Sequence, residues 1–118
     1  MANRWIVAAG IGGAAGVALG AAGRHMASAT ELFDVASRYL LYHALALVAV
    51  ALLEAQRESR PLAIAGWCFL VGMICFGGGL VALSLTGSAL AGASTPVGGT
   101  LFILGWLALA WHGVGARR

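Results

Sequence analysis

Long apolar stretches alternate with short charged segments along the chain, and this pattern predicts the architecture. No Asp, Glu, Lys or Arg occurs at positions 5–23 or 39–53, and a third such run extends from 61 to 116. A bilayer core about 30 Å thick takes roughly 20 helical residues at about 1.5 Å each. The first two runs therefore predict one transmembrane helix each, and the third predicts two helices with a connection.

The third run breaks most naturally between Gly87 and Pro96, where small residues are concentrated. Thr95 suits the N-cap of a helix, and Pro96 suits its first position, where a missing N–H costs nothing. We therefore expect an all-α, polytopic membrane protein, a four-transmembrane-helix bundle. Membrane β-barrels need alternating apolar and polar positions, which the sequence lacks. The helices are expected at about 5–23, 38–55, 61–85 and 96–114, so that residues 1–118 form a single transmembrane domain.

Composition supports this assignment and excludes other classes of protein. Of the 118 residues, 61% are apolar and only 9% are charged, against about 25% charged in an average soluble domain. So few charges cannot cover the surface of a soluble protein, and so many apolar residues exclude a disordered chain.

The arginines predict the orientation, because four spans place both termini on the same side of the membrane. On that side lie Arg4, Arg57, Arg60, Arg117 and Arg118, and on the other side lie Arg24 and Arg38. The positive-inside rule therefore predicts a bacterial inner-membrane protein with its N and C termini in the cytoplasm. Arginines at such flanks are typical of contact with anionic lipids. They form no pattern that indicates nucleic-acid binding.

The segment from 24 to 38 is the longest polar stretch on the outer side. Ser28 and Glu31 have the spacing of a capping box, and Asp34 precedes Arg38 by four residues in the favourable order. We therefore expect a short outer amphipathic segment that leads into the second transmembrane helix. Two placements fit it equally well: the surface of the outer leaflet, or a direct extension of the second helix above the membrane.

Glycines mark two further features. Gly12, Gly16 and Gly20 form a tandem GxxxG pattern on one face of the first helix, which allows another helix to approach closely. We favour packing against the protein's own helices, and the alternative is docking of a second copy or of a partner helix. In the third helix, residues 77–79 are Gly77, Gly78 and Gly79. They predict close packing, a bend or local unwinding, the last of which leaves room for a small-solute pathway.

The polar side chains near the outer ends of the first two helices predict one candidate ligand cluster. Its members are Arg24, His25, Arg38, Tyr39, Tyr42 and His43. An ionisable residue within the membrane is a functional candidate by default. We favour hydrogen-bonded packing for this cluster. The alternatives are a headgroup or quinone-like ligand site, a proton-handling site, and a haem or metal site.

Catalytic chemistry has little support in the sequence. It contains no HExxH, no Cys-x-x-Cys, no phosphate-binding loop and no dinucleotide fingerprint. Cys68 and Cys75 would lie about 10 Å apart along one helix, too far for a disulfide. Trp5 and His112 are expected at the membrane interface, and Glu54 at an ordinary charged helix end. We expect no catalytic residue, no metal and no cofactor, and we favour a non-enzymatic protein.

Four segments resemble a known family. GALG-x-x-G-x-H is similar to residues 19–25, A-x-R-Y-x-x-Y-H-A-L-A-L to 36–47, F-S-G-S-L-Y in part to 76–80, and T-P-x-G-G-x-x-F-x-x-G-W to 95–106. The family is domain-of-unknown-function 423, small bacterial membrane proteins related to transmembrane protein 256. The resemblance implies four helices in the inner membrane and no established activity. The chain departs from the family at Leu40, where Gln is common, and at Gly77, Gly79 and Val81, which replace serines and a tyrosine.

These observations favour a small membrane protein that acts by helix packing. We expect an accessory or assembly subunit, or a lipid-contacting stabiliser, of a membrane complex. The alternative is binding or transport of a small solute, lipid or quinone-like ligand through the outer His/Arg/Tyr cluster. A third interpretation is a haem or metal redox subunit. The expected partners are membrane lipids, with a larger membrane protein complex or a second copy of the chain.

Overall fold

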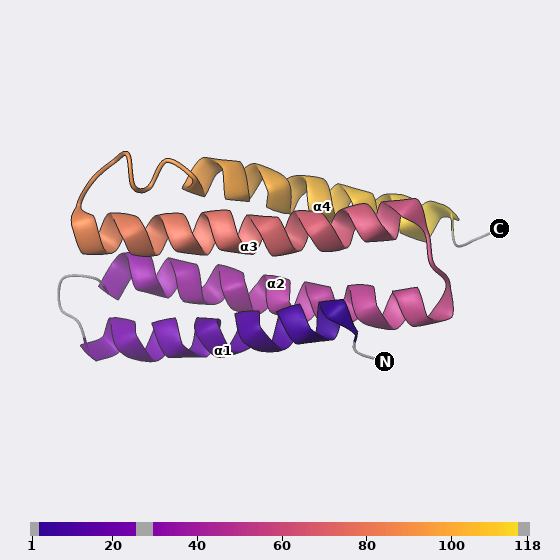
Figure 1. Cartoon of the computed structure of the whole chain (residues 1–118), viewed down its shortest axis with the longest axis horizontal. Helices are drawn as coiled ribbons and strands as arrows, with labels where there is room; N and C mark the ends of the chain where they lie inside the picture. Colours follow the sequence, from indigo (N-terminus) through magenta and orange to yellow (C-terminus); the bar gives the residue numbers. More distant parts are fainter. Residues whose placement is uncertain (1–2, 26–29, 116–118) are drawn as a thin grey trace.

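The computed structural model, which describes residues 3–25 and 30–115, is a bundle of four antiparallel α-helices (Figure 1). Each helix is long and apolar enough to cross a membrane. The predicted all-α class with four spans is therefore confirmed. The helices are α1 (Arg4–His25), α2 (Thr30–Gln56), α3 (Arg60–Thr86) and α4 (Thr95–Gly115).

The bundle consists of two helical hairpins that lie side by side. Helix α1 packs along α2, and α3 packs along α4, while α2 and α3 meet at the centre (Figure 1). Helices α1 and α3 barely touch. Figure 1 shows the start of α1 and the end of α4 at the same end of the bundle, which we call the terminal end. The connection 87–94 lies at the opposite end, which we call the loop end.

The ends of α3 follow local backbone chemistry. The Ser59 hydroxyl accepts a hydrogen bond from the Leu62 N–H at 3.2 Å and so caps the start of the helix, with Pro61 in the first turn. Gly87 ends the helix in the left-handed conformation, with φ of 69°, and its N–H donates to the Leu83 carbonyl at 2.8 Å. Helix α4 begins at Thr95, one residue before the predicted start.

Helix α2 begins eight residues earlier than predicted, at Thr30 instead of 38. Phe33, Ala36, Ser37 and Leu40 are all buried, and their spacing of three or four residues continues the buried stripe of the transmembrane helix. Residues 30–38 of the polar segment are therefore a direct extension of α2, which is one of the two placements that we considered. The proposed capping residue Ser28 lies outside the described residues.

Glycines set the close approach of α3 and α4. A Cβ added at Gly98 would meet the backbone nitrogen of Phe76 and would lie 2.7 Å from the Gly72 carbonyl oxygen. A Cβ at Gly105 would lie 2.7 Å from the Phe69 ring. Because glycine has no side chain, the backbones of the two helices can touch at these positions. The fully buried Phe69 then packs at the centre of the core.

The three consecutive glycines of α3 remain within one continuous helix. Gly77 faces α2, where its Cβ would lie 3.2 Å from the Leu40 side chain, and Gly79 faces the start of α4, 2.7 Å from the Ser94 hydroxyl. Gly78 points into open space. Of the three arrangements that we considered for these residues, the structure therefore has close packing, at two of the three glycines.

Candidate functional site

His43 forms the centre of the most polar arrangement within the membrane-spanning part of the bundle. Its ring is only 4% exposed and stacks on Phe102, with 3.6 Å between ring centroids and 7° between planes. Nε2 lies 3.1 Å from Trp106 Nε1, and Nδ1 lies 2.6 Å from the Tyr39 carbonyl oxygen. An indole N–H only donates and a carbonyl only accepts, so Nε2 accepts and Nδ1 carries the proton. Both nitrogens of this histidine are therefore engaged.

Aromatic side chains surround His43 and line an open groove of about 740 Å³. The Tyr39 ring stacks on Phe76, with 4.8 Å between centroids, and Phe69 meets Trp106 edge to face at 5.0 Å. We call this the aromatic groove. It is lined by Tyr39, Tyr42, His43, Leu45, Phe76, Gly99, Phe102, Ile103 and Trp106.

The structure divides the predicted outer cluster. Tyr39, Tyr42 and His43 lie together in the aromatic groove. Arg38 is exposed and pairs with Asp34 on its own helix, at 3.1 Å. Arg24 and His25 are exposed at the end of α1, and neither lines the aromatic groove.

The rotation of α2 explains this division. Ser37, Leu41 and Ala44 face α1, where they meet Gly12, Gly13, Gly16 and Gly20. Successive helical residues point about 100° apart, so His43 lies on a neighbouring face and reaches α4 instead of α1. The cluster predicted between α1 and α2 therefore does not form as a unit.

The GxxxG face of α1 lies against the chain's own helices. A Cβ at Gly16 would lie 2.9 Å from the Leu41 side chain, and one at Gly20 would lie 2.8 Å from the Ser37 hydroxyl. That hydroxyl donates to the Gly16 carbonyl oxygen at 2.6 Å. At Gly12 a Cβ would meet the Met73 side chain of α3. Within the described residues, the glycine face is therefore covered from inside the bundle.

Trp5 and Glu54 form a second polar contact, at the terminal end, which sequence reasoning missed. Trp5 is fully buried, and its Nε1 donates to Glu54 Oε2 at 3.1 Å. The Arg4 guanidinium lies 3.7 Å from the same oxygen and 4.7 Å above the Trp5 ring. A Cβ at Gly66 would lie 2.5 Å from that ring, so the glycine makes room for Trp5 against α3. The sequence carries no signal that pairs Trp5 with Glu54.

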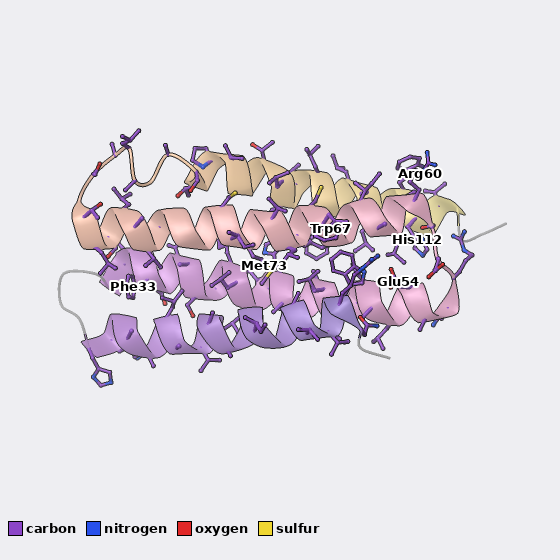
Figure 2. The ribbon with its side chains drawn as sticks, in the orientation of Figure 1. Phe33, Glu54, Arg60, Trp67, Met73 and His112 are labelled. Atoms are coloured by element: carbon purple, nitrogen blue, oxygen red, sulfur yellow. The ribbon has the colours of Figure 1, made fainter. Side chains whose placement is uncertain are left out.

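His112 is also buried, although the sequence predicted an interfacial position. It is 5% exposed, and its Nδ1 lies 2.6 Å from the hydroxyl of Ser59, the N-cap of α3. Figure 2 shows His112 and Glu54 at the terminal end of the bundle. Beside His112 lies a pocket of about 540 Å³, which we call the terminal pocket. It is lined by Leu53, Gln56, Arg57, Leu109, His112 and Gly113.

A third hollow is an apolar groove of about 980 Å³ between α1 and α3. We call it the lateral groove. It runs from Arg4 at the terminal end to Leu85 near the loop end, and Arg4 is the one charged residue in its lining. Small residues of its lining include Gly12, Ala15 and Gly78.

Metal-binding side chains do not gather in residues 3–25 and 30–115, where no group of three or more His, Cys, Asp or Glu is placed to hold an ion. Cys68 and Cys75 are both free thiols. Several of the side-chain contacts described above join helices to one another, among them His43 with Trp106 and Ser37 with Gly16.

Comparison with known proteins identifies the family. Residues 19–99 match the family described as protein of unknown function (DUF423). A UPF0382 membrane protein of Haemophilus influenzae is 34% identical over 117 residues, which cover 94% of both chains. The UPF0382 membrane protein YwdK of Bacillus subtilis is 33% identical over 110 residues, covering 87% of this chain and 89% of the relative.

A third relative, a UPF0382 membrane protein of Staphylococcus epidermidis, is 39% identical over 79 residues, which are 67% of this chain and 64% of the relative. No solved structure matches. The relatives are bacterial membrane proteins by name, and this chain has four candidate spans. The chain is thus a small, multi-pass bacterial membrane protein that belongs to the DUF423/UPF0382 family, as its motifs predicted.

Proposed function

We propose that this protein is a non-enzymatic accessory or assembly subunit of a membrane complex and that it acts by helix packing. Its lateral groove receives a transmembrane helix of a partner protein. It lies in the inner membrane with both termini in the cytoplasm, as the distribution of arginines favours.

The lateral groove is the observation that carries this proposal. Helices α1 and α3 barely touch, and they leave about 980 Å³ of apolar space along the bundle. Transmembrane helices associate where small residues let backbones approach closely. The exposed Ala15 and Gly78 supply such positions, and no titratable group other than Arg4 lines the groove. A hollow of this composition suits an apolar helix better than a polar solute.

The hydrogen bonds of the polar residues also support a packing role. His43 uses both nitrogens within the bundle, and Glu54 accepts from Trp5. Arg38 pairs with its neighbour Asp34. Chemistry on a substrate would first require these contacts to break.

The test fills the groove without disturbing the bundle. Gly78 lines the groove, and a Cβ there meets nothing within 4 Å, so Gly78→Leu adds bulk where a partner helix would lie. Gly10→Leu is the matched control, because Gly10 also faces open space but does not line the groove. A photo-crosslinking residue then replaces Ile11, which lines the groove. In the control it replaces Val17, which lies on the same helix outside the groove. The two side chains are similarly exposed, Ile11 at 69% and Val17 at 63%.

In native membranes, the probe at Ile11 is expected to capture one membrane protein that the probe at Val17 does not capture. Gly78→Leu should abolish this product, and Gly10→Leu should preserve it. Capture of lipid alone at Ile11, or equal loss of the product in both leucine variants, would refute the proposal.

A second candidate function is the binding of a flat, quinone-like ligand in the aromatic groove. The observation that favours it is the row of aromatic rings along about 740 Å³ of open space, with the Tyr39 and Tyr42 hydroxyls unpartnered among the described residues. A short-chain ubiquinone analogue should then quench tryptophan fluorescence saturably. Trp106→Leu should abolish the saturable part, and linear quenching in the unmodified protein would exclude this candidate.

A further inference from the structure

The terminal pocket combines polar donors at the membrane surface with an apolar side toward the bilayer. Arg57 and Gln56 lie where α2 ends, and His112 lies in the last turn of α4. Leu53 and Leu109 lie about one turn deeper along the same two helices. This order of polar and apolar groups suits an amphiphile that enters from the side of the bundle.

His112 can present a ring N–H to this pocket. The Ser59 hydroxyl oxygen accepts from the Leu62 N–H at 3.2 Å and lies 2.6 Å from His112 Nδ1, to which it can donate its own proton. With Nδ1 as the acceptor, Nε2 carries the ring proton. The part of the chain that the structure describes offers this Nε2 no hydrogen-bond partner. In that tautomer the His112 side chain, which is only 5% exposed, places an unused Nε2–H beside the pocket.

Arg57 supplies the charge. It forms no ion pair within residues 3–25 and 30–115. Its Nη2 atom lies 3.8 Å from the position that a Cβ on Gly115 would take, so the guanidinium reaches from the end of α2 to the end of α4. Two acidic residues lie near Arg57 in the chain: Glu54 is held by Trp5 and Arg4, and the exposed Glu58 forms no ion pair with Arg57. The positive charge at the pocket is therefore available to a ligand.

We propose that the terminal pocket binds the phosphate group of an anionic phospholipid. The phosphate oxygens accept from the Arg57 guanidinium and from His112 Nε2–H, since an oxyanion pairs best with charged and fixed donors. The acyl chains lie along Leu53 and Leu109. Basic pockets between transmembrane helices bind lipid headgroups in this way. The site is separate from the lateral groove, so it does not depend on the proposed partner helix.

The test counts bound lipids by native mass spectrometry. The full chain is reconstituted in nanodiscs of equal parts phosphatidylglycerol and phosphatidylcholine, and the lipids that stay bound on release are identified. Wild type is expected to retain phosphatidylglycerol preferentially. Arg57→Gln removes one charged contact and should weaken this retention about tenfold. Arg60→Gln is the matched control, since this exposed arginine lies at the same end (Figure 2) and does not line the pocket.

The outcomes separate a built site from general attraction of charge. Equal loss in the Arg57→Gln and Arg60→Gln variants would overturn the proposal, and so would displacement of the lipid by inorganic phosphate, which would show a site for free anions. His112→Phe should lose the same preference. If that variant does not fold, the two arginine variants decide alone. Arg57→Gln should leave crosslinking from Ile11 unchanged, so failure of this site is distinguishable from failure of the partner-helix proposal.

Discussion

The hydrogen bond between His43 and Trp106 offers a direct measure of what joins α2 to α4. The two groups lie 3.1 Å apart, and His43 is 4% exposed while Trp106 is 46% exposed. Trp106→Phe keeps a ring but removes the N–H. His43→Phe keeps a flat ring beside Phe102 but removes both nitrogens. The two variants and their double mutant form a thermodynamic cycle that isolates the pair.

The expected magnitudes follow from burial. Trp106→Phe leaves the buried Nε2 of His43 without a donor, which costs about 1–3 kcal/mol of unfolding free energy. His43→Phe leaves only a half-exposed indole N–H unpaired and inserts a larger ring, with a cost of about 1–3 kcal/mol from overpacking. Hydrogen bonds between transmembrane helices average about 0.6 kcal/mol and reach about 1.7. The double mutant should therefore be more stable than the sum of single effects predicts, by about 0.6–1.7 kcal/mol.

The assay is reversible unfolding in mixed micelles of increasing SDS content, followed by far-UV circular dichroism because tryptophan itself is changed. Trp111→Phe is the control, since it makes the same substitution on the same helix at an exposed residue that lies outside the aromatic groove. Its cycle with His43→Phe should be additive. Additivity within about 0.3 kcal/mol for Trp106 as well would refute the assignment of this bond as a link between the helices.

Two further predictions use the same titration. Gly98→Ala should lower the unfolding free energy by about 1–3 kcal/mol, because its Cβ would meet the Phe76 backbone and force α3 from α4. A Cβ added at Gly113 would meet nothing within 4 Å, so Gly113→Ala should stabilise the helix by up to about 1 kcal/mol. A loss of stability in both the Gly98 and the Gly113 variants would contradict the close packing assigned to Gly98. Arg38→Gln should change stability by less than about 0.5 kcal/mol, because its pair with Asp34 is exposed at both ends. A larger loss would show that Arg38 has a further contact.

Most helix ends could be predicted from charge, because charges are costly within a bilayer. Helix α1 begins and ends within two residues of the first charge-free run, α3 begins one residue before the third run, and α4 ends one residue before the end of that run. The break between α3 and α4 lies inside the run and was predicted from its small residues and from Thr95 and Pro96. For the same reason, the prediction placed the start of α2 eight residues too late, at 38 instead of Thr30. Arg38 bounds the charge-free run and Asp34 lies one turn before it, but both are on the exposed face of a helix whose other face, with Phe33 and Ser37, stays buried.

The site could not be predicted in the same way, because it depends on how α2 is rotated. His43 and Trp106 are 63 residues apart in the chain, and neither residue type indicates which helix the other lies on. One signal was present. The family patterns at 36–47 and 95–106 contain both residues, and these two segments meet in the aromatic groove. Patterns shared between two distant segments predicted important residues without predicting their contact.

Polar side chains of α2 provide what apolar packing lacks, namely a unique register between helices. Apolar faces can slide with little loss of contact in lipid, where no hydrophobic force drives helices together. The Ser37 hydroxyl binds the Gly16 carbonyl, and Glu54 binds the indole of Trp5, so α1 is held at two points eleven residues apart on its own axis. A slip of one residue moves α1 by about 1.5 Å and rotates its contacts by about 100°. That slip would break both bonds and drive the side chains of residues that now flank the glycine face into α2.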